Sequence, residues 1–194
     1  MVEKRALEFA IRMHKGQCRK DGSEYINHPI RVADYVRKYV RENLKILVAS
    51  AYLHDTIEDT DTTYDDLLTN FGVEIADIVL ELTTDKDLKN KLGKTRYLQK
   101  KMKNMTDLAL ALKLCDRLDN ICDSINADSK FRSKYINETI DIINYLLDNR
   151  NLDKTHLILI EQILIKIKLL SNTLSEKNKE VEYLLKLVLT KDNK

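Results

Sequence analysis

Apolar residues recur at three- and four-residue spacing along most of the chain, the period of an α-helix that buries one face. The first clear faces are those of Val32, Ala33, Val36 and Val40, and of Leu44, Leu47, Val48 and Ala51. The same spacing predicts further helices over about 64–71, 73–83, 94–104, 106–123 and 130–148. The segments Asp61-Thr62-Thr63 and Thr106-Asp107 supply N-cap chemistry for the helices that follow them. The pattern therefore predicts an all-α fold.

The two ends of the chain add detail to this fold. Residues 20–24 read as the one clear turn, so we expect a bundle of about 8–10 helices with at most a short β-hairpin near residues 18–27. From Asp153 to about Leu189 the pattern is again helical, with an interruption expected near Ser171-Asn172. This C-terminal part is expected to pack on the same domain or on a second copy of the chain.

Composition agrees with a helical, compact protein. The 194 residues suit one domain, or two at most, and a hydrophobic content of 43% supports a core. Only four Gly and one Pro argue against an all-β fold. Three cysteines predict reduced thiols in a cytoplasmic protein, and no signal peptide, transmembrane segment or phosphate-binding glycine loop is expected.

The distribution of charge is more informative than its sum of +2. Residues 1–48 carry eleven bases and six acids, residues 49–88 carry eleven acids and one base, and residues 89–103 carry seven bases and no acid. Carboxylates that hold a cation, close to bases that neutralise a phosphate, would produce this alternation. Solvated helix faces would produce it as well, so the motifs must decide.

One imidazole and three carboxylates crowd the end of a predicted helix. His54-Asp55 is followed by Glu58 and Asp59, one helical turn further on. Carboxylates packed together without a base repel one another, and a divalent cation removes that repulsion. Mixed histidine and carboxylate donors suit Mn²⁺, Fe²⁺ or Zn²⁺ better than Ca²⁺. Helix capping and surface charge are the alternative explanation.

Two further positions carry polar groups where a ligand could be held. Asp116 and Asn120 share one face of an otherwise apolar helix, where burial is costly unless the groups bind something. His28 lies beside a turn and at a helix start. A capping role for His28 is equally compatible with the sequence.

Three segments together resemble the RelA/SpoT hydrolase family: RKDGSEYINHP (19–29), LHDTIEDTDTT (53–63) and KLCDRLDN (113–120). Its members are all-α metal enzymes of the HD superfamily that remove the 3′-pyrophosphate of ppGpp and pppGpp, the alarmones of the stringent response. The similarity is greatest to small stand-alone hydrolases such as the metazoan SpoT homologue. It implies an HD-type hydrolase domain over residues 1–150 and a helical extension over 151–194.

The resemblance also implies roles for individual residues. It implies Mn²⁺ as cofactor, bound by His28, His54, Asp55 and Asp116, with Glu58 and Asp59 as the catalytic pair. Residues implied to bind the nucleotide are Arg19, Lys20, Asn120, Lys91, Lys94 and Arg96. The products would be GDP or GTP and pyrophosphate, with no synthesis of alarmone.

Several alternatives stay open at this point. An HD-type phosphohydrolase for another nucleotide, such as NADPH, an adenosine alarmone or a deoxynucleotide, would have a similar sequence. A non-catalytic alarmone-binding module would not need both the metal ligands and the Glu58-Asp59 pair. Nucleic-acid binding through 89–103 is disfavoured because no aromatic ladder interleaves the bases. A small nucleotide is the expected partner, without nucleic acid or membrane, and a homo-oligomer through the C-terminal helices is conceivable.

Overall fold

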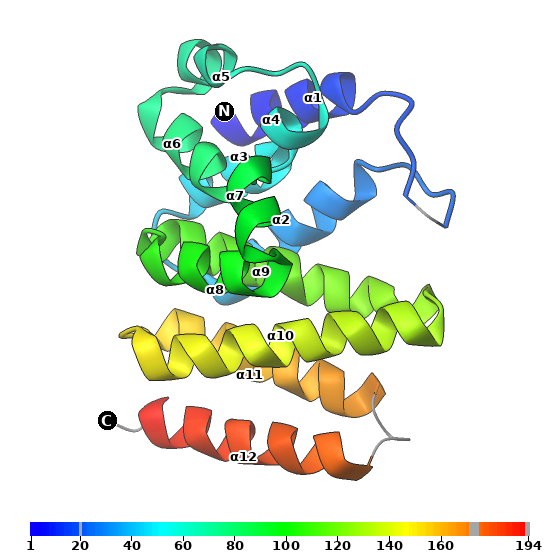
Figure 1. Cartoon of the computed structure of the whole chain (residues 1–194). Helices are drawn as coiled ribbons and strands as arrows, with labels where there is room; N and C mark the ends of the chain where they lie inside the picture. Colours follow the sequence, from blue (N-terminus) through cyan, green and yellow to red (C-terminus); the bar gives the residue numbers. More distant parts are fainter. Residues whose placement is uncertain (20, 171–174, 193–194) are drawn as a thin grey trace. The chain divides into compact units, whose positions relative to one another are not determined.

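The computed structural model describes residues 1–19, 21–170 and 175–192, and these residues are helical almost throughout. They form twelve α-helices and one short 3-10 helix, with no strand among the described residues (Figure 1). An isolated antiparallel bridge joins Cys18 and Glu24, where at most a short hairpin was expected. The all-α prediction is confirmed.

The helices outnumber the expected eight to ten because two of them are short. Helix α4 (Thr56–Asp59) has 4 residues and α7 (Lys86–Leu92) has 7. Elements of one or two turns present too few positions for an apolar period to be recognised. The helices predicted over 64–71 and 94–104 have these same bounds in the structure, as α5 (Tyr64–Phe71) and α8 (Lys94–Asn104).

The chain separates into two compact units. The first comprises Met1–Lys86 with Met105–Cys115, and the second comprises Asp87–Asn104 with Asp116–Lys194. Helix α9 (Asp107–Asp123) runs without interruption through the point of division. The predicted division into residues 1–150 and 151–194 stays a prediction.

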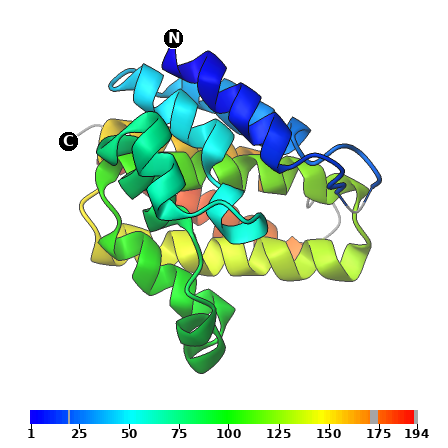
Figure 2. The ribbon, with the colours of Figure 1, turned by 90° about the horizontal axis from the view of Figure 1, so that it is seen from above.

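The first unit is built around α3 (Leu44–Leu53), in which every residue from Leu47 to Leu53 is buried. Its sequence is apolar on all sides, so it must be covered from several directions. Helices α1 (Val2–Met13), α2 (Asn27–Tyr39) and α6 (Val73–Leu82) pack against it, and α5 packs against α6. Figure 2 shows α1 in dark blue alongside α3 in cyan.

The loop between α1 and α2 turns back on itself at two glycines. Gly16 and Gly22 have φ angles of +82° and +86°, which side chains with a Cβ adopt only at a cost. Between them, the Asp21 carboxylate accepts hydrogen bonds from the backbone amide and the hydroxyl of Ser23. After this turn the chain passes through Tyr25 and enters α2.

The second unit is a set of long helices: α8, α10 (Ser129–Asn149), α11 (Lys154–Leu170) and α12 (Ser175–Asp192). Helix α10 packs against α8, and α11 packs against α12. A short 3-10 helix (Ser124–Asn126) precedes α10. In Figure 1, α10, α11 and α12 follow one another in alternating directions. The expected interruption at Ser171-Asn172 lies outside the described residues, and an oligomer through these helices stays a prediction.

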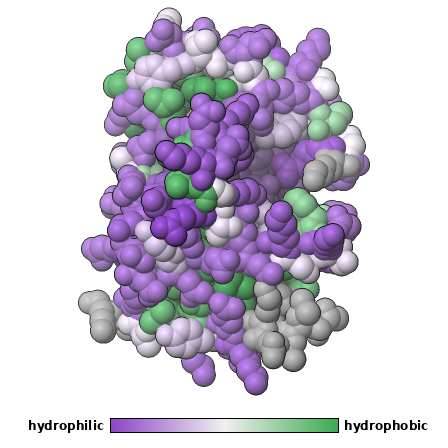
Figure 3. All heavy atoms as spheres, viewed as in Figure 1, coloured by the Kyte–Doolittle hydropathy of each residue, from purple (hydrophilic) through white to green (hydrophobic). Residues whose placement is uncertain are grey.

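One face of the molecule is mostly hydrophilic. Figure 3 shows one face, on which hydrophobic side chains form only small groups. None of the described helices combines the length and the apolar character that crossing a lipid bilayer requires. None of Cys18, Cys115 and Cys122 takes part in a disulfide among the described residues.

Candidate metal centre and active site

Two helices of the first unit bring His28 and His54 together. His28 lies in the first turn of α2, and His54 directly follows the last residue of α3, against which α2 packs. Their rings meet edge to face with centroids 5.1 Å apart. Relative exposures of 2% and 1% show that both imidazoles are buried.

A backbone contact fixes the tautomer of His54. Its Nδ1 lies 2.8 Å from the carbonyl oxygen of Ala51, and a carbonyl only accepts, so Nδ1 carries the hydrogen. In the neutral ring Nε2 then presents a lone pair, at 3.0 Å from Oδ2 of Asp55. The same carboxylate oxygen lies 3.6 Å from Nε2 of His28. The Nε2 lone pair of His54, directed at a carboxylate oxygen at 3.0 Å, needs a proton or a cation between the two atoms, as a metal site provides.

Asp116 completes the cluster from α9. The ligand atoms of His28, His54 and Asp116 all lie within 4.8 Å of one another, and all three residues are buried. Asp116 follows Cys115 in the same unbroken helix. The donor set of imidazole nitrogens and carboxylate oxygens fits a divalent transition metal. These residues form a candidate metal site.

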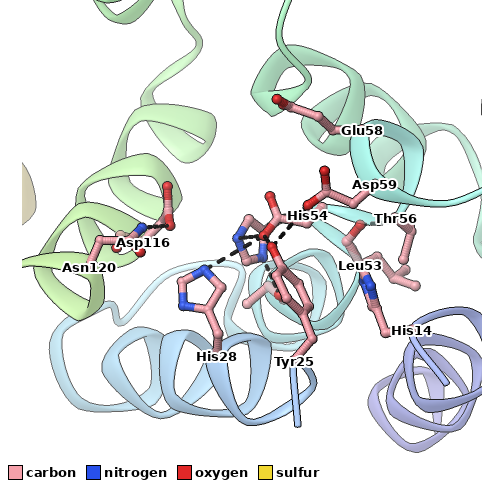
Figure 4. A network of polar contacts seen from close by, with 12 residues as sticks. His14, Tyr25, His28, Leu53, His54, Thr56, Glu58, Asp59, Asp116 and Asn120 are labelled. Atoms are coloured by element: carbon pink, nitrogen blue, oxygen red, sulfur yellow. Dashed lines mark hydrogen bonds and ion pairs between the residues drawn. The ribbon is translucent and has the colours of Figure 1, made fainter. Parts of the chain in front are cut away.

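Tyr25 connects this cluster to the predicted catalytic carboxylate. Its hydroxyl donates to Oδ2 of Asp55 at 2.6 Å and to Oδ2 of Asp59 at 3.0 Å (Figure 4). Burial, and then the charge of Asp55, raise the pKa of Asp59 above its usual value, although the hydrogen bond from Tyr25 opposes this. Burial and the two carboxylates raise the pKa of Tyr25 far above its usual value, so its hydroxyl remains a proton donor.

Glu58 has a different environment from Asp59. Its Oε2 accepts a hydrogen bond from the backbone amide of Thr84 at 2.9 Å. In Figure 4 its side chain extends away from Tyr25, whereas that of Asp59 faces the Tyr25 hydroxyl. Of the predicted catalytic pair, Asp59 is therefore the residue tied to the cluster.

The predicted nucleotide-binding residues fall in several places. The Arg19 guanidinium lies 5.9 Å from the centre of the Tyr25 ring, and Lys20 lies outside the described residues. Asn120 donates to Oδ1 of Asp116 at 2.6 Å, which orients that carboxylate.

The remaining three bases belong to the second unit, where Lys91 and Arg96 are exposed. Lys94 forms an ion pair with Glu138 at 3.1 Å. Their role in binding a nucleotide stays a prediction.

Sequence patterns did not identify three residues next to this site: Tyr25, His14 and Gln17. His14 stacks on Tyr25 with ring centroids 4.8 Å apart, and Gln17 donates to the backbone carbonyl of Asp59 at 2.7 Å. Tyr25 and Gln17 lie in a loop where no helical period applies. The only signal was their position inside or next to the segment that carried the resemblance.

Taken together, the fold and the site define an all-α protein with a candidate metal centre built on a His-Asp pair. The model of the HD domain family matches residues 6–151, which is more than half of the chain, so the chain belongs to this family.

Several proteins of similar sequence carry the description that the three motifs predicted. A guanosine-3′,5′-bis(diphosphate) 3′-pyrophosphohydrolase of Aquifex aeolicus is 37% identical over an alignment of 147 residues that covers 71% of this chain and 20% of that protein. Human MESH1, with the same description, is 40% identical over 120 residues, 61% of this chain and 66% of MESH1. The chain thus spans a fifth of the first relative and just under two thirds of the second.

Solved structures agree on the fold. A metazoan ortholog of SpoT, described as hydrolyzing ppGpp, matches with a TM-score of 0.69 and 23% identity, over 85% of this chain and 94% of that one. A Listeria monocytogenes protein matches with a TM-score of 0.60 and 22% identity, over 75% of this chain and 96% of that one. At these identities the structures support the fold alone.

Proposed function

We propose that this protein is a Mn²⁺-dependent guanosine-3′,5′-bis(diphosphate) 3′-pyrophosphohydrolase, which converts ppGpp or pppGpp to GDP or GTP and pyrophosphate. The observation that carries the proposal is the grouping of His28, His54 and Asp116, with Asp55 beside both histidines and joined to Asp59 through one hydroxyl. The names of the relatives supply the substrate.

In this proposal, His28, His54, Asp55 and Asp116 hold the metal. When bound, Mn²⁺ lowers the pKa of a coordinated water and polarises a phosphate oxygen. His54 would bind the metal through Nε2, because its Nδ1–H donates a hydrogen bond to the Ala51 carbonyl. Asn120 orients the Asp116 carboxylate. The four ligands come from three different helical segments, so the site exists only in the folded chain.

Asp59 acts as the general base. A carboxylate whose pKa is raised by burial and a neighbouring charge is a stronger base than an exposed one. It takes the proton of the attacking water as the water oxygen bonds to phosphorus. The bond between this phosphorus and the ribose 3′-oxygen breaks, and the 3′-oxygen leaves as a hydroxyl with the proton that Asp59 took from the water. Arg19 stabilises the charge that develops on the phosphate.

The test uses metal-stripped protein incubated with ppGpp, with and without Mn²⁺, while GDP, pyrophosphate and orthophosphate are followed together. Equimolar GDP and pyrophosphate that appear only with Mn²⁺ would support the proposal. Folded, metal-loaded protein without turnover would exclude this substrate, and turnover of NADPH or a deoxynucleotide in a parallel panel would identify a related hydrolase. Binding of ppGpp without turnover would indicate a sensor module.

A further inference from the structure

We infer that Tyr25 is a positioning residue of this site, whose hydroxyl holds the proposed base Asp59 and the proposed metal ligand Asp55 in one fixed arrangement. The part of this inference that concerns Asp59 rests on the proposed function. The part that concerns Asp55 depends on metal binding alone. Sequence patterns gave Tyr25 no role, and the structure places it at the centre of the polar contacts in Figure 4.

The first argument is the geometry of the hydroxyl. Its oxygen lies 2.6 Å from Oδ2 of Asp55 and 3.0 Å from Oδ2 of Asp59, so its single hydrogen is shared between two carboxylates four residues apart in the chain. Without it, two negatively charged groups would repel one another and separate. Short hydrogen bonds to charged acceptors are about twice as strong as those between neutral groups, so the bridge opposes this separation effectively.

The second argument is that the Tyr25 ring is itself held in place. It stacks on the buried ring of His14, with centroids 4.8 Å apart and planes inclined by 30°. The Tyr25 backbone amide donates to the carbonyl of Gln17 at 3.0 Å. A side chain fixed at both backbone and ring loses little conformational freedom when its hydroxyl binds, as a preorganised group should.

The third argument is that the contacts form a closed circuit. The Gln17 amide nitrogen donates to the Asp59 carbonyl at 2.7 Å, so its Oε1 faces His14. His14 Nδ1 lies 2.8 Å from that oxygen and therefore carries the hydrogen. The circuit runs from Asp59 through Gln17, His14 and Tyr25 back to Asp59. It fixes both the backbone and the carboxylate of the proposed base.

The contacts of Tyr25 extend to its other neighbours as well. His28 lies three residues later in the chain, and its backbone amide donates a hydrogen bond to the Tyr25 carbonyl at 3.0 Å. The Arg19 guanidinium lies over the Tyr25 ring. Tyr25 is thus in contact with a metal ligand, with the proposed base and with a residue expected to bind phosphate.

The experiment compares Tyr25→Phe with Tyr64→Phe. Tyr64 is a matched control because its hydroxyl also donates to a carboxylate, Asp77, at 2.7 Å, on the exposed surface of α5 and α6. For each variant we measure Mn²⁺ affinity by titration calorimetry, kcat and KM for ppGpp, and the midpoint of thermal unfolding. We expect Tyr25→Phe to lower Mn²⁺ affinity or kcat by about 10-fold or more, with KM changed less than about 3-fold. Tyr64→Phe should leave both unchanged.

The outcomes separate the inference from the proposed function. If Tyr25→Phe matches Tyr64→Phe in metal affinity and kcat, or loses only thermal stability, the inference is overturned. If the unmodified protein does not hydrolyse ppGpp, the proposed function fails, and the Mn²⁺ titration still decides whether Tyr25 supports Asp55. Should Tyr25→Phe not fold, His14→Phe keeps an aromatic ring against Tyr25 and removes the bond to Gln17. Its kcat should then fall in the same direction, and an unchanged kcat would overturn the inference.

Discussion

Glu58 accepts a hydrogen bond from the backbone amide of Thr84 at 2.9 Å, which ties the short helix α4 to the segment that follows α6. Half of the expected catalytic pair therefore has a structural partner. Any catalytic role of Glu58 must be separated experimentally from this structural one.

Replacing Glu58 in two ways separates the roles. Glu58→Gln keeps an oxygen that can accept from Thr84, so we expect its free energy of unfolding to lie within about 0.5 kcal/mol of that of the original protein. Glu58→Ala leaves the amide without this acceptor and should cost about 1 kcal/mol. If Glu58 takes part in catalysis, both variants lose about 100-fold in kcat. Full turnover by Glu58→Gln would assign Glu58 to structure alone.

Asp59→Asn should abolish most turnover while sparing the metal. The amide oxygen can still accept from Tyr25, but it cannot take a proton, so we expect kcat to fall by about 100-fold or more. Calorimetry should show Mn²⁺ affinity within a few-fold of the original. A variant that retains full turnover with metal bound would show that another group is the base.

The same substitution should stabilise the metal-stripped protein at neutral pH. The pKa of Asp59 is raised in the folded state, first by burial and then by Asp55, so folding favours its protonated form. This contribution to stability is present below the ordinary pKa of 3.8 and is lost as the pH rises through the higher folded-state pKa. Asn mimics the protonated form. Chemical unfolding should show Asp59→Asn more stable than the original at pH 7, with the difference vanishing near pH 3.

Metal binding should itself stabilise the fold. At a free Mn²⁺ concentration of about 100 times Kd, the expected gain is about 2.7 kcal/mol, or a rise in Tm of about 5–10 °C. His54→Ala should lose this rise in Tm. The control, His156→Ala, removes a buried histidine of α11 outside the candidate site, and it should retain the rise despite a lower starting Tm. The measurement is thermal unfolding with and without a chelator. An equal shift in both variants would argue against the candidate metal site.

The second unit contains a buried ion pair that should matter for stability. Arg117 is 3% exposed, and its guanidinium lies 3.5 Å from the carboxylate of Glu138, which is 6% exposed. Glu138→Gln leaves a buried charge without its counterion and should cost about 3 kcal/mol. Glu182→Gln breaks the exposed pair with Lys168 and should change the unfolding midpoint little. Equal effects in denaturant titrations would contradict this distinction.

The helices that could be predicted were those whose sequence carries an apolar period, and for some of them a capping residue also marked the start. Thr63 caps α5 and forms a reciprocal pair of hydrogen bonds with Asp66, as its position before an apolar run suggested. The α9 pattern likewise predicted that Asp116 and Asn120 share a face, and the bond between them agrees. Local rules suffice here because each contact spans at most one turn.

The contacts that sequence patterns missed span long stretches of chain. Tyr25 and Asp55 are 30 residues apart, and Glu58 and Thr84 are 26 apart. No periodicity relates such positions, since they meet only after α2, α3 and α6 have packed. The sequence could predict which residue types gather at the site, but not that one carboxylate faces Tyr25 while its neighbour binds a backbone amide.

The end of α1 has a consequence for how the chain can be shortened. A fragment that starts at Gly16 would keep every residue expected to bind metal or to act on the substrate. It would lose His14, and with it the ring against which Tyr25 rests. It would also strip Ala6, Phe9 and Ala10, the buried face of α1, from the helix α3 that ends at His54. A domain boundary drawn from the motifs alone would therefore remove the helix that supports the candidate site.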